Sequence, residues 1–375
     1  MTQLPAPPAQ PAPKPPPAKP ARRFMKQPNM LRVLYALVPL VLAGIYLFGW
    51  RVLGLLIITT AAGLAMEAVT SRKRGQPISM ACFVTCFLFA LSLPPTTPFW
   101  IAVIGVAVGI LFGKEVFGGF GRNFANPAIV GRAFVYVSFP PELTAAYEPA
   151  FRNWPGGLTH WSIQTWGHVP GYLESTHASV TDAISQATPM LARQRYGYET
   201  PWWDLFTGSI GGTFDAGQEG TRILAAGSIG EVSAALIILA GVYLLVTRTA
   251  NWRLTVSCLA GAVVANLALR DLMGYDQVPP LPFTLLSGAL LYGAVFMVTD
   301  PVSAPKKPLA MYGYGAFIGI MVVFLRWRSQ FVGAVAFSIL LGNIVGPLMD
   351  IGANWWTQRR KAAGAPPPAK PEGAA

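Results

Sequence analysis

The sequence predicts an all-α polytopic membrane protein with ten transmembrane helices, built as two inverted five-helix halves with an extracytoplasmic insertion between them. Of 375 residues, 53% are hydrophobic and only 12% are charged, whereas a soluble domain carries about 25% charged residues. The hydrophobic residues gather in ten runs, the longest close to the roughly 20 residues that a helix needs to cross a bilayer. A long polar stretch separates five runs from five, and an odd number of crossings inverts the second group relative to the first.

The ten expected spans are defined by these apolar runs. Those of the first half are Leu31–Trp50, Val52–Val69, Ile78–Leu93, Phe99–Phe112 and Pro127–Phe139. Those of the second half are Ile229–Val246, Leu254–Leu269, Leu281–Val298, Leu309–Leu325 and Phe331–Leu348. The expected domains are a disordered proline-rich tail over 1–29, the two halves over 30–139 and 228–350, the insertion over 140–227 and a C-terminal tail over 351–375.

The placement of basic residues predicts the orientation. The loops "SRKRGQ", "APKKP" and "TQRRK" would share one side of the membrane, and "LPPTTP" would lie on the other. Because short cytoplasmic loops collect Lys and Arg, both termini are expected in the cytoplasm and residues 140–227 outside it. The net charge of +12 is spread over these loops and the tails. No basic face is interleaved with aromatic residues, which argues against nucleic acid as a partner.

Two pairs of glycines four residues apart support the inverted halves. Gly105 and Gly109 follow one proline-rich loop, and Gly315 and Gly319 follow another. Such spacing lets helix backbones approach closely. The alternative is that glycine is simply common in membrane helices.

Ionisable side chains in or beside the spans are candidates for function, because a charge inside a bilayer is costly. Glu67 follows Gly63 by one helical turn inside an apolar run, so it should face protein or a water-filled path. Asp300 and Asp350 each end a span, where a carboxylate either offers oxygen ligands to a small cation or only stops the helix. The remaining candidates, for some of which a place at the membrane surface is the alternative, are Lys114, Glu115, Arg132 and Glu231.

A glycine-rich segment, "GKEVFGGFGRNFANPAIVGRAF", places Asn123 and Asn126 just before a helix that starts at Pro127. Backbone N–H groups at a helix N-terminus point outward, so this segment is a place for a polar or anionic ligand. It matches neither the phosphate-binding loop nor the dinucleotide fingerprint.

The polar stretch "TDAISQATPM" in the insertion contains Thr188, with Asp182 and Ser185 upstream. A threonine hydroxyl is a poor nucleophile without a base, and His177 alone does not make a catalytic triad. Judged by itself, the stretch is typical of an ordinary surface helix.

Six motifs in order nevertheless resemble one family, that of the B subunit of the sodium-translocating NADH:quinone reductase and the D subunit of the Rnf electron-transport complex (NqrB/RnfD). They are "SLPPTTPFW", "GKEVFGGFGRNFANPAIVGRAF", "DAISQATPM", "GSIGEVSA", "FMVTDPVSA" and "GNIVGPLMD". The resemblance runs from about Val52 to Asp350 and implies a subunit of a redox-driven ion pump in a bacterial inner membrane. "GSIGEVSA" is more similar to the Nqr branch, and "VSFP" to the Rnf branch.

The resemblance implies FMN joined through its phosphate to a threonine in a D-x-x-[ST]-G-A-T motif that a separate flavin transferase reads. Thr188 matches the attachment residue, and Asp182, Ser185 and Ala187 complete the motif. Gln186 stands where the motif has glycine; if that position needs a positive φ angle, glutamine weakens the attachment. The threonine would anchor the cofactor, and the redox chemistry would belong to the flavin.

Further sites follow from the same resemblance. It implies a second, non-covalent flavin, riboflavin, beside Asn123 and Asn126. The implied quinone and ion pathway, for Na⁺ or H⁺, comprises Gly63, Glu67, Asp300 and Asp350. The short proline-rich N-terminus departs from the longer leader of the Nqr subunit, which contributes near the quinone site.

The expected activity belongs to a complex. The chain has no NADH fingerprint and no cysteine set for an iron–sulfur cluster, so other Nqr/Rnf subunits must supply electrons. As a subunit of an ion-translocating oxidoreductase it would not be active alone. Two alternatives remain at this point: a ten-helix channel or transporter without a redox group, and a structural paralogue without cofactor.

Overall fold

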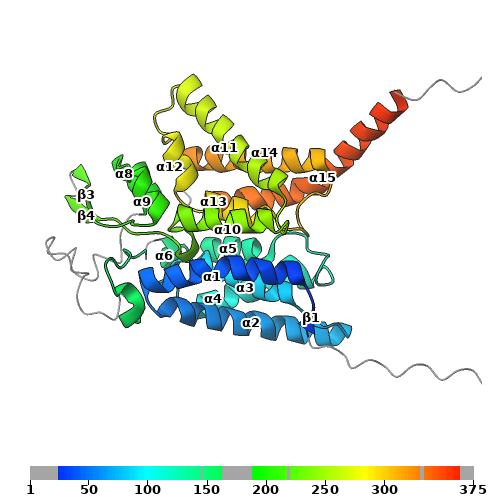
Figure 1. Cartoon of the computed structure of the whole chain (residues 1–375), viewed down its shortest axis with the longest axis horizontal. Helices are drawn as coiled ribbons and strands as arrows, with labels where there is room; N and C mark the ends of the chain where they lie inside the picture. Colours follow the sequence, from blue (N-terminus) through cyan, green and yellow to red (C-terminus); the bar gives the residue numbers. More distant parts are fainter. Residues whose placement is uncertain (1–23, 145–146, 163–187, 218–219, 330–332, 364–375) are drawn as a thin grey trace, which may run out of the picture.

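The computed structural model describes residues 24–144, 147–162, 188–217, 220–329 and 333–363. In these residues the chain is mainly helical (Figure 1). Five helices are long and apolar enough to cross a membrane: Pro28–Phe48, Arg51–Arg74, Trp252–Leu272, Pro308–Arg328 and Ala334–Arg360. Shorter apolar helices lie at Met80–Leu91, Pro127–Ser138 and Ala234–Val246. The protein is therefore built as a membrane-embedded helical bundle.

The first half follows the expected runs closely. It contains α1 (Pro28–Phe48), α2 (Arg51–Arg74), α3 (Met80–Leu91), α4 (Phe99–Ile110), the π-helical turn η1 (Leu111–Glu115) and α5 (Pro127–Ser138). Pro28 stands in the first turn of α1, where its missing N–H has no helical acceptor to lose. Helix α2 ends at Gly75, whose φ of 64° needs the freedom of glycine. A two-residue parallel pair joins β1 (Phe24–Met25) to β2 (Ile78–Ser79).

The second half contains one expected span that is wrong as a single helix. Its elements are α10 (Ala234–Val246), α11 (Trp252–Leu267), η7 (Ala268–Leu272), α12 (Leu281–Leu286), α13 (Leu290–Tyr292), η8 (Gly293–Met297), α14 (Pro308–Arg328) and α15 (Ala334–Ala363). The run Leu281–Val298 breaks at Ser287, which is extended, and at Gly288, which has a φ of 62°. An apolar run indicates burial, but it does not indicate whether the helix inside it is continuous.

Regular structure reaches into both expected tails. Strand β1 begins at Phe24, inside the tail that the sequence predicts to be disordered, and α15 continues through Ala363 in the C-terminal one. Arginines four residues after tryptophans extend the helix: the Arg359 guanidinium lies 4.0 Å from the Trp355 ring centroid, and the next pair repeats the contact. Such spacing places the two side chains on one helix face.

The described residues of the expected insertion form short elements at one end of the bundle. They are α6 (Pro140–Thr144), η2 (Gly156–Thr159), α8 (Pro189–Tyr196), α9 (Trp202–Thr207) and an antiparallel pair of β3 (Thr213–Asp215) with β4 (Thr221–Ile223), followed by η6 (Ile229–Glu231). In Figure 1 these elements lie at the left, whereas β1 and the end of α15 lie at the right. The two ends of the described chain thus emerge opposite the insertion.

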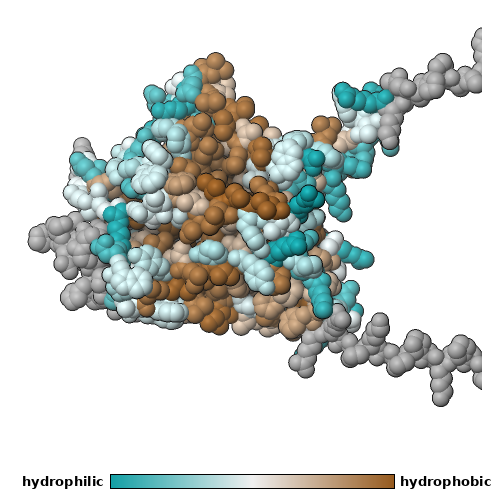
Figure 2. Space-filling model, in the orientation of Figure 1, coloured by the Kyte–Doolittle hydropathy of each residue, from teal (hydrophilic) through white to brown (hydrophobic). Residues whose placement is uncertain are grey.

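The surface carries an apolar belt between two more hydrophilic ends (Figure 2). Large hydrophobic side chains are exposed along the helices, among them Leu42, Ile57, Val137, Leu239 and Val264. A soluble monomer rarely exposes so large a contiguous apolar surface. The belt therefore fits contact with lipid.

The two glycine pairs expected from the sequence both lie at close helix–helix contacts. A Cβ on Gly109 would overlap the Pro127 carbonyl of α5, and one on Gly319 would overlap the Cys258 carbonyl of α11. Helix α4 therefore packs backbone to backbone against α5, and α14 against α11, as small residues permit.

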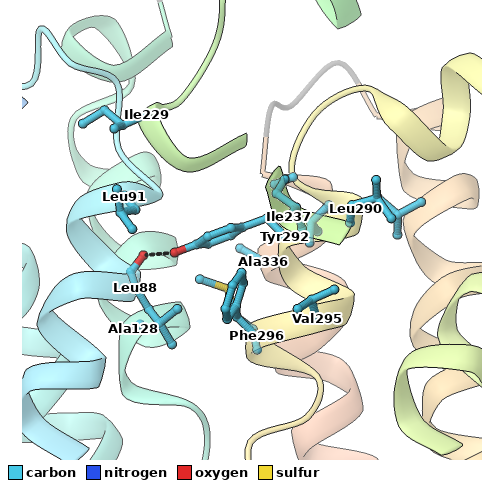
Figure 3. Packing of buried hydrophobic residues seen from close by; sticks show 14 of the residues in the cluster. Leu88, Leu91, Ala128, Ile229, Ile237, Leu290, Tyr292, Val295, Phe296 and Ala336 are labelled. Atoms are coloured by element: carbon cyan, nitrogen blue, oxygen red, sulfur yellow. Dashed lines mark hydrogen bonds between the residues drawn. The ribbon is translucent and has the colours of Figure 1, made fainter. Parts of the chain in front are cut away.

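A buried cluster joins the two halves at the centre of the molecule. The Tyr292 hydroxyl donates to the Leu88 carbonyl of α3 at 3.2 Å (Figure 3). The Tyr292 and Phe296 rings lie 5.2 Å apart between centroids, and both are almost fully buried. The halves thus share one core.

Candidate functional site

Three of the predicted site residues line one cavity of about 390 Å³, here called the large cavity. Its wall comes from the start of α1, from α3, from the glycine-rich segment before α5, and from η8 with the turn that follows. Ligand sites of small molecules typically measure about 300–1,000 Å³. The predicted site residues on its wall are Asn123, Asn126 and Asp300.

The two asparagine side chains have different roles. The Asn126 side-chain oxygen accepts from the Ala128 N–H at 3.0 Å, so this residue caps α5. The Asn123 side-chain oxygen is buried and has no hydrogen-bond partner among the described residues. Because an unpaired buried acceptor is costly, Asn123 is available to a ligand that brings a donor.

Asp300 and Asp350 are engaged by the backbone and lie in separate cavities. Asp300 accepts from the Val302 N–H and the Ser303 hydroxyl, both at 3.0 Å. Asp350 accepts from the Lys307 N–H at 2.9 Å and so holds the start of α14. It lines a smaller cavity of about 160 Å³, whose wall also includes Asn123. Asp300 therefore stabilises the turn that follows η8, and Asp350 caps the start of α14.

Glu67 lies in a buried cluster of charges, as its position in the apolar run predicts. One carboxylate oxygen accepts from the Ser79 N–H and hydroxyl at 2.8 Å, and the other accepts from the Lys114 ammonium at 2.6 Å. Lys114 also donates to the Ser79 hydroxyl at 2.7 Å. Gly63 lies one turn away, and a Cβ there would overlap the Cys86 sulfur. A buried carboxylate needs such a cation and such donors.

The same cluster continues to Glu115, which pairs with Arg74 and lies 3.8 Å from the Lys114 ammonium. Both Lys114 and Glu115 are buried inside the protein, so neither side chain extends into water. Ser79 gave no signal in the sequence. Lys114 was visible only as an ionisable residue, because its pairing depends on the π-helical turn η1 that ends α4.

Thr188 begins α8 and lines a second cavity, here called the Thr188 cavity. Its side-chain oxygen accepts from the Leu191 N–H at 3.4 Å, which makes it the N-cap of the helix. Arg132 from α5, Glu231 from η6 and Arg326 from α14 line the same cavity. Of the predicted attachment motif, Asp182, Ser185 and Ala187 lie outside the described residues.

The residues present fit both implied flavins in kind. Thr188 lines the same cavity as two arginines, whose guanidinium groups suit a phosphate ester. Asn123 offers an unpaired acceptor in a cavity of ligand size, which suits the N–H of a flavin ring. Among the described residues no group of three or more His, Cys, Asp or Glu could hold a metal ion.

Three relatives are similar to this chain over most of its length. The B subunit of the Na⁺-translocating NADH-quinone reductase of Azotobacter vinelandii is 34% identical over 78% of this chain and 64% of its own length. The corresponding protein of Klebsiella pneumoniae is 33% identical over 80% of this chain and 65% of its own. The D subunit of the ion-translocating oxidoreductase complex of Aeromonas hydrophila is 34% identical over 88% of this chain and 93% of its own.

The chain thus spans about 64% of the length of the first of these relatives, the reductase protein of Azotobacter vinelandii. The family described as NQR2, RnfD, RnfE matches residues 21–359, which include every element described above except the last few residues of α15. The chain therefore belongs to the NQR2, RnfD, RnfE family.

Proposed function

We propose that this chain is a membrane flavoprotein subunit of an Nqr/Rnf-type complex that couples electron transfer to the movement of Na⁺ or H⁺. It carries FMN as a phosphoester on Thr188 and exchanges electrons with partner subunits. The relatives support the complex, since their names describe subunits of ion-translocating oxidoreductases. One observation carries the attachment: the Thr188 hydroxyl lies at a helix N-terminus, on the wall of a cavity with two arginines.

A second flavin, riboflavin, binds without a covalent bond in the large cavity. Asn123 supplies the acceptor, and Asn126 keeps its side-chain N–H₂ for the ligand because only its oxygen is needed for the cap. Flavin, when bound, supplies one- and two-electron chemistry. The protein's own part is to hold the ring between the apolar and the polar side chains of the cavity wall.

Among the described residues the two cavities share no lining residue, and packed side chains close one wall of the large cavity. Leu88 and Phe296 line the large cavity, and Tyr292 packs against both of them (Figure 3). Electrons that pass between the two sites would cross this buried wall, while ions would need another route. Such separation is what coupling requires, because a shared open path would let ions leak.

The ion and quinone pathway involves Gly63, Glu67, Asp300 and Asp350. In the described state each carboxylate already has donors, and the Lys114 ammonium occupies the position that a cation would take at Glu67. A cation therefore binds at Glu67 only after Lys114 moves away. Quinone is the proposed acceptor in an Nqr-type complex; in an Rnf-type complex a partner subunit takes that place.

The attachment is tested on a denaturing gel under ultraviolet light, with the chain produced beside its flavin transferase. A phosphoester survives denaturation, so the wild-type band should fluoresce and Thr188→Val should lose essentially all of its fluorescence. Thr207→Val is the matched control: this threonine lies in the same segment and donates to the Trp203 carbonyl, outside the Thr188 cavity. Its band should stay bright.

A dark wild-type band would favour the rival function, a ten-helix channel or transporter without a redox group. Mass spectrometry of the peptide around Thr188 from native membranes gives the same decision. An unmodified mass alone would contradict the electron-carrier proposal.

A further inference from the structure

Arg132 is a buried cation whose donors are not used by the described protein. Its side chain is 5% exposed, and within the described residues it forms no hydrogen bond or ion pair. Its guanidinium carbon lies 4.9 Å from the centroid of the Tyr136 ring, and Glu231 is the carboxylate whose charge acts on it without a direct ion pair. Arg326 differs, since it donates to the Thr284 and Ser287 carbonyls at 2.9 and 3.1 Å. An unpaired buried guanidinium is costly, so its retention needs a partner.

Arg132 lines the same cavity as Thr188, and the size of that cavity restricts the partner. The space measures about 70 Å³. At 10–15 Å³ for each water-sized sphere, it holds roughly five to seven such spheres. A three-ring flavin does not fit in it, but a tetrahedral oxyanion with its central atom and four oxygens does.

The charge of the wall matches an anion with a single charge. Arg132 and Arg326 contribute two positive charges, and Glu231, which accepts from the Ser228 N–H at 2.9 Å, contributes one negative charge. Glu148, which follows the lining residue Tyr147, adds little negative charge at neutral pH, because burial raises its pKa to about 8. One net positive charge balances a phosphodiester, whereas a phosphomonoester carries about −1.5 to −2.

The N-terminus of α8 favours the same occupant. Thr188 is the N-cap of this eight-residue helix, so a phosphate esterified to its hydroxyl lies where the helix dipole and free N–H groups favour an anion.

We propose that the Thr188 cavity is a phosphodiester site, in which Arg132 pairs with the phosphate that links the flavin to Thr188. Arg132 is a positioning residue: it holds the phosphate inside the protein and leaves the ring system outside the cavity. The inference rests on the proposed attachment at Thr188, and it adds a residue that holds the phosphate, which the attachment alone does not identify.

The test compares the temperature of unfolding of the full chain made with and without the flavin transferase. In the flavinylated protein Arg132→Gln removes a charge pair, so the unfolding temperature should fall by several degrees. In the flavin-free protein the same change removes an unpaired buried charge, so the temperature should stay equal or rise. Arg132→Lys keeps the charge and should lower the temperature less than Arg132→Gln in the flavinylated protein.

Arg51→Gln is the control, because Arg51 uses its donors on the carbonyls of Pro95, Thr96 and Thr97, away from the cavity. It should lower the unfolding temperature equally with and without flavin. An equal effect of Arg132→Gln in both forms, on a fluorescent band, would overturn the phosphate site and leave the attachment standing. A dark wild-type band would overturn both.

A measurement on the wild type covers the case in which Arg132→Gln does not fold. Inorganic phosphate, added to the flavin-free chain at constant ionic strength, should raise the unfolding temperature relative to chloride. If the effect comes from an adventitious ion only, phosphate and chloride should change the unfolding temperature equally. That result would contradict the phosphate site.

Discussion

At the scale of the residue, position in the fold decides what a side chain offers. Asn123 and Asn126 are the same residue type three positions apart, yet one caps a helix and the other keeps an unpaired oxygen on a cavity wall. The sequence predicts that both are at the site. It does not predict which is free, because that depends on where α5 begins relative to the cavity.

A change of Asn123 therefore tests the large cavity. Asn123→Leu removes the acceptor, so the purified protein should release less flavin on acid precipitation, and affinity for riboflavin should fall roughly tenfold for the loss of about 1.4 kcal/mol. Asn343→Leu is the matched control, since its side-chain oxygen is also buried and unpaired but lies outside the large cavity. Equal flavin release from the wild type and Asn123→Leu would contradict this site.

The charged residues show which properties of a site can be predicted from local sequence. Burial of Glu67 was predictable from the apolar run around it, and the structure confirms it. Its pairing with Lys114 and Ser79 was not, because the three residues come from α2, η1 and β2 and meet only when these elements pack. The capping of α14 by Asp350 is likewise a contact between elements and leaves no local pattern.

At the scale of the element, hydrophobicity predicts where helices lie better than whether they are continuous. Nine of the ten expected runs coincide with a main helix, whereas Leu281–Val298 is divided among α12, α13 and η8. The Ser287–Gly288 break is visible in the sequence only as two small residues. Its conformation follows from Arg326, whose guanidinium holds the Thr284 and Ser287 carbonyls that the break leaves without helical partners.

The close contact of α14 with α11 gives a prediction for these helices. Gly319→Ala places a methyl group against the Cys258 carbonyl, so it should destabilise the protein by about 1–3 kcal/mol through overpacking. In Gly352→Ala the new methyl group meets open space on α15, so the substitution should be neutral or slightly stabilising. Unfolding temperatures in detergent distinguish the two; an equal response would mean that the α11–α14 contact has room to adjust.

At the scale of the whole molecule, the described ends of the chain lie opposite the insertion (Figure 1). The basic loops predict that both termini lie on the side of the membrane opposite residues 140–227, and the positions of the described ends in Figure 1 agree with this prediction. The inverted relation of the two halves stays a prediction, since similar glycine contacts in α4–α5 and α11–α14 agree with it but do not define an axis.

Sidedness is tested with single cysteines and a maleimide that does not cross membranes. Trp154→Cys replaces a side chain that is 82% exposed in the insertion, and Arg359→Cys replaces an exposed one near the end of α15. Intact spheroplasts should label only the first, and permeabilised cells both. The native Cys82, Cys86 and Cys258 are buried, so the background should be low. Labelling of Arg359→Cys in intact spheroplasts would reverse the proposed orientation.

The pairing of β1 with β2 affects how a ligand enters and leaves the large cavity. Lys26 and Gln27, directly after β1, form part of the cavity wall, and they are fastened by a two-residue ladder and by the Gln27 side chain, which accepts from the Ala81 N–H at 3.1 Å. Separating β1 and Gln27 from their partners breaks only a few hydrogen bonds, and it does not require any membrane helix to move. We therefore expect a bound molecule to exchange when residues 24–27 separate from β2, without any opening of the bundle.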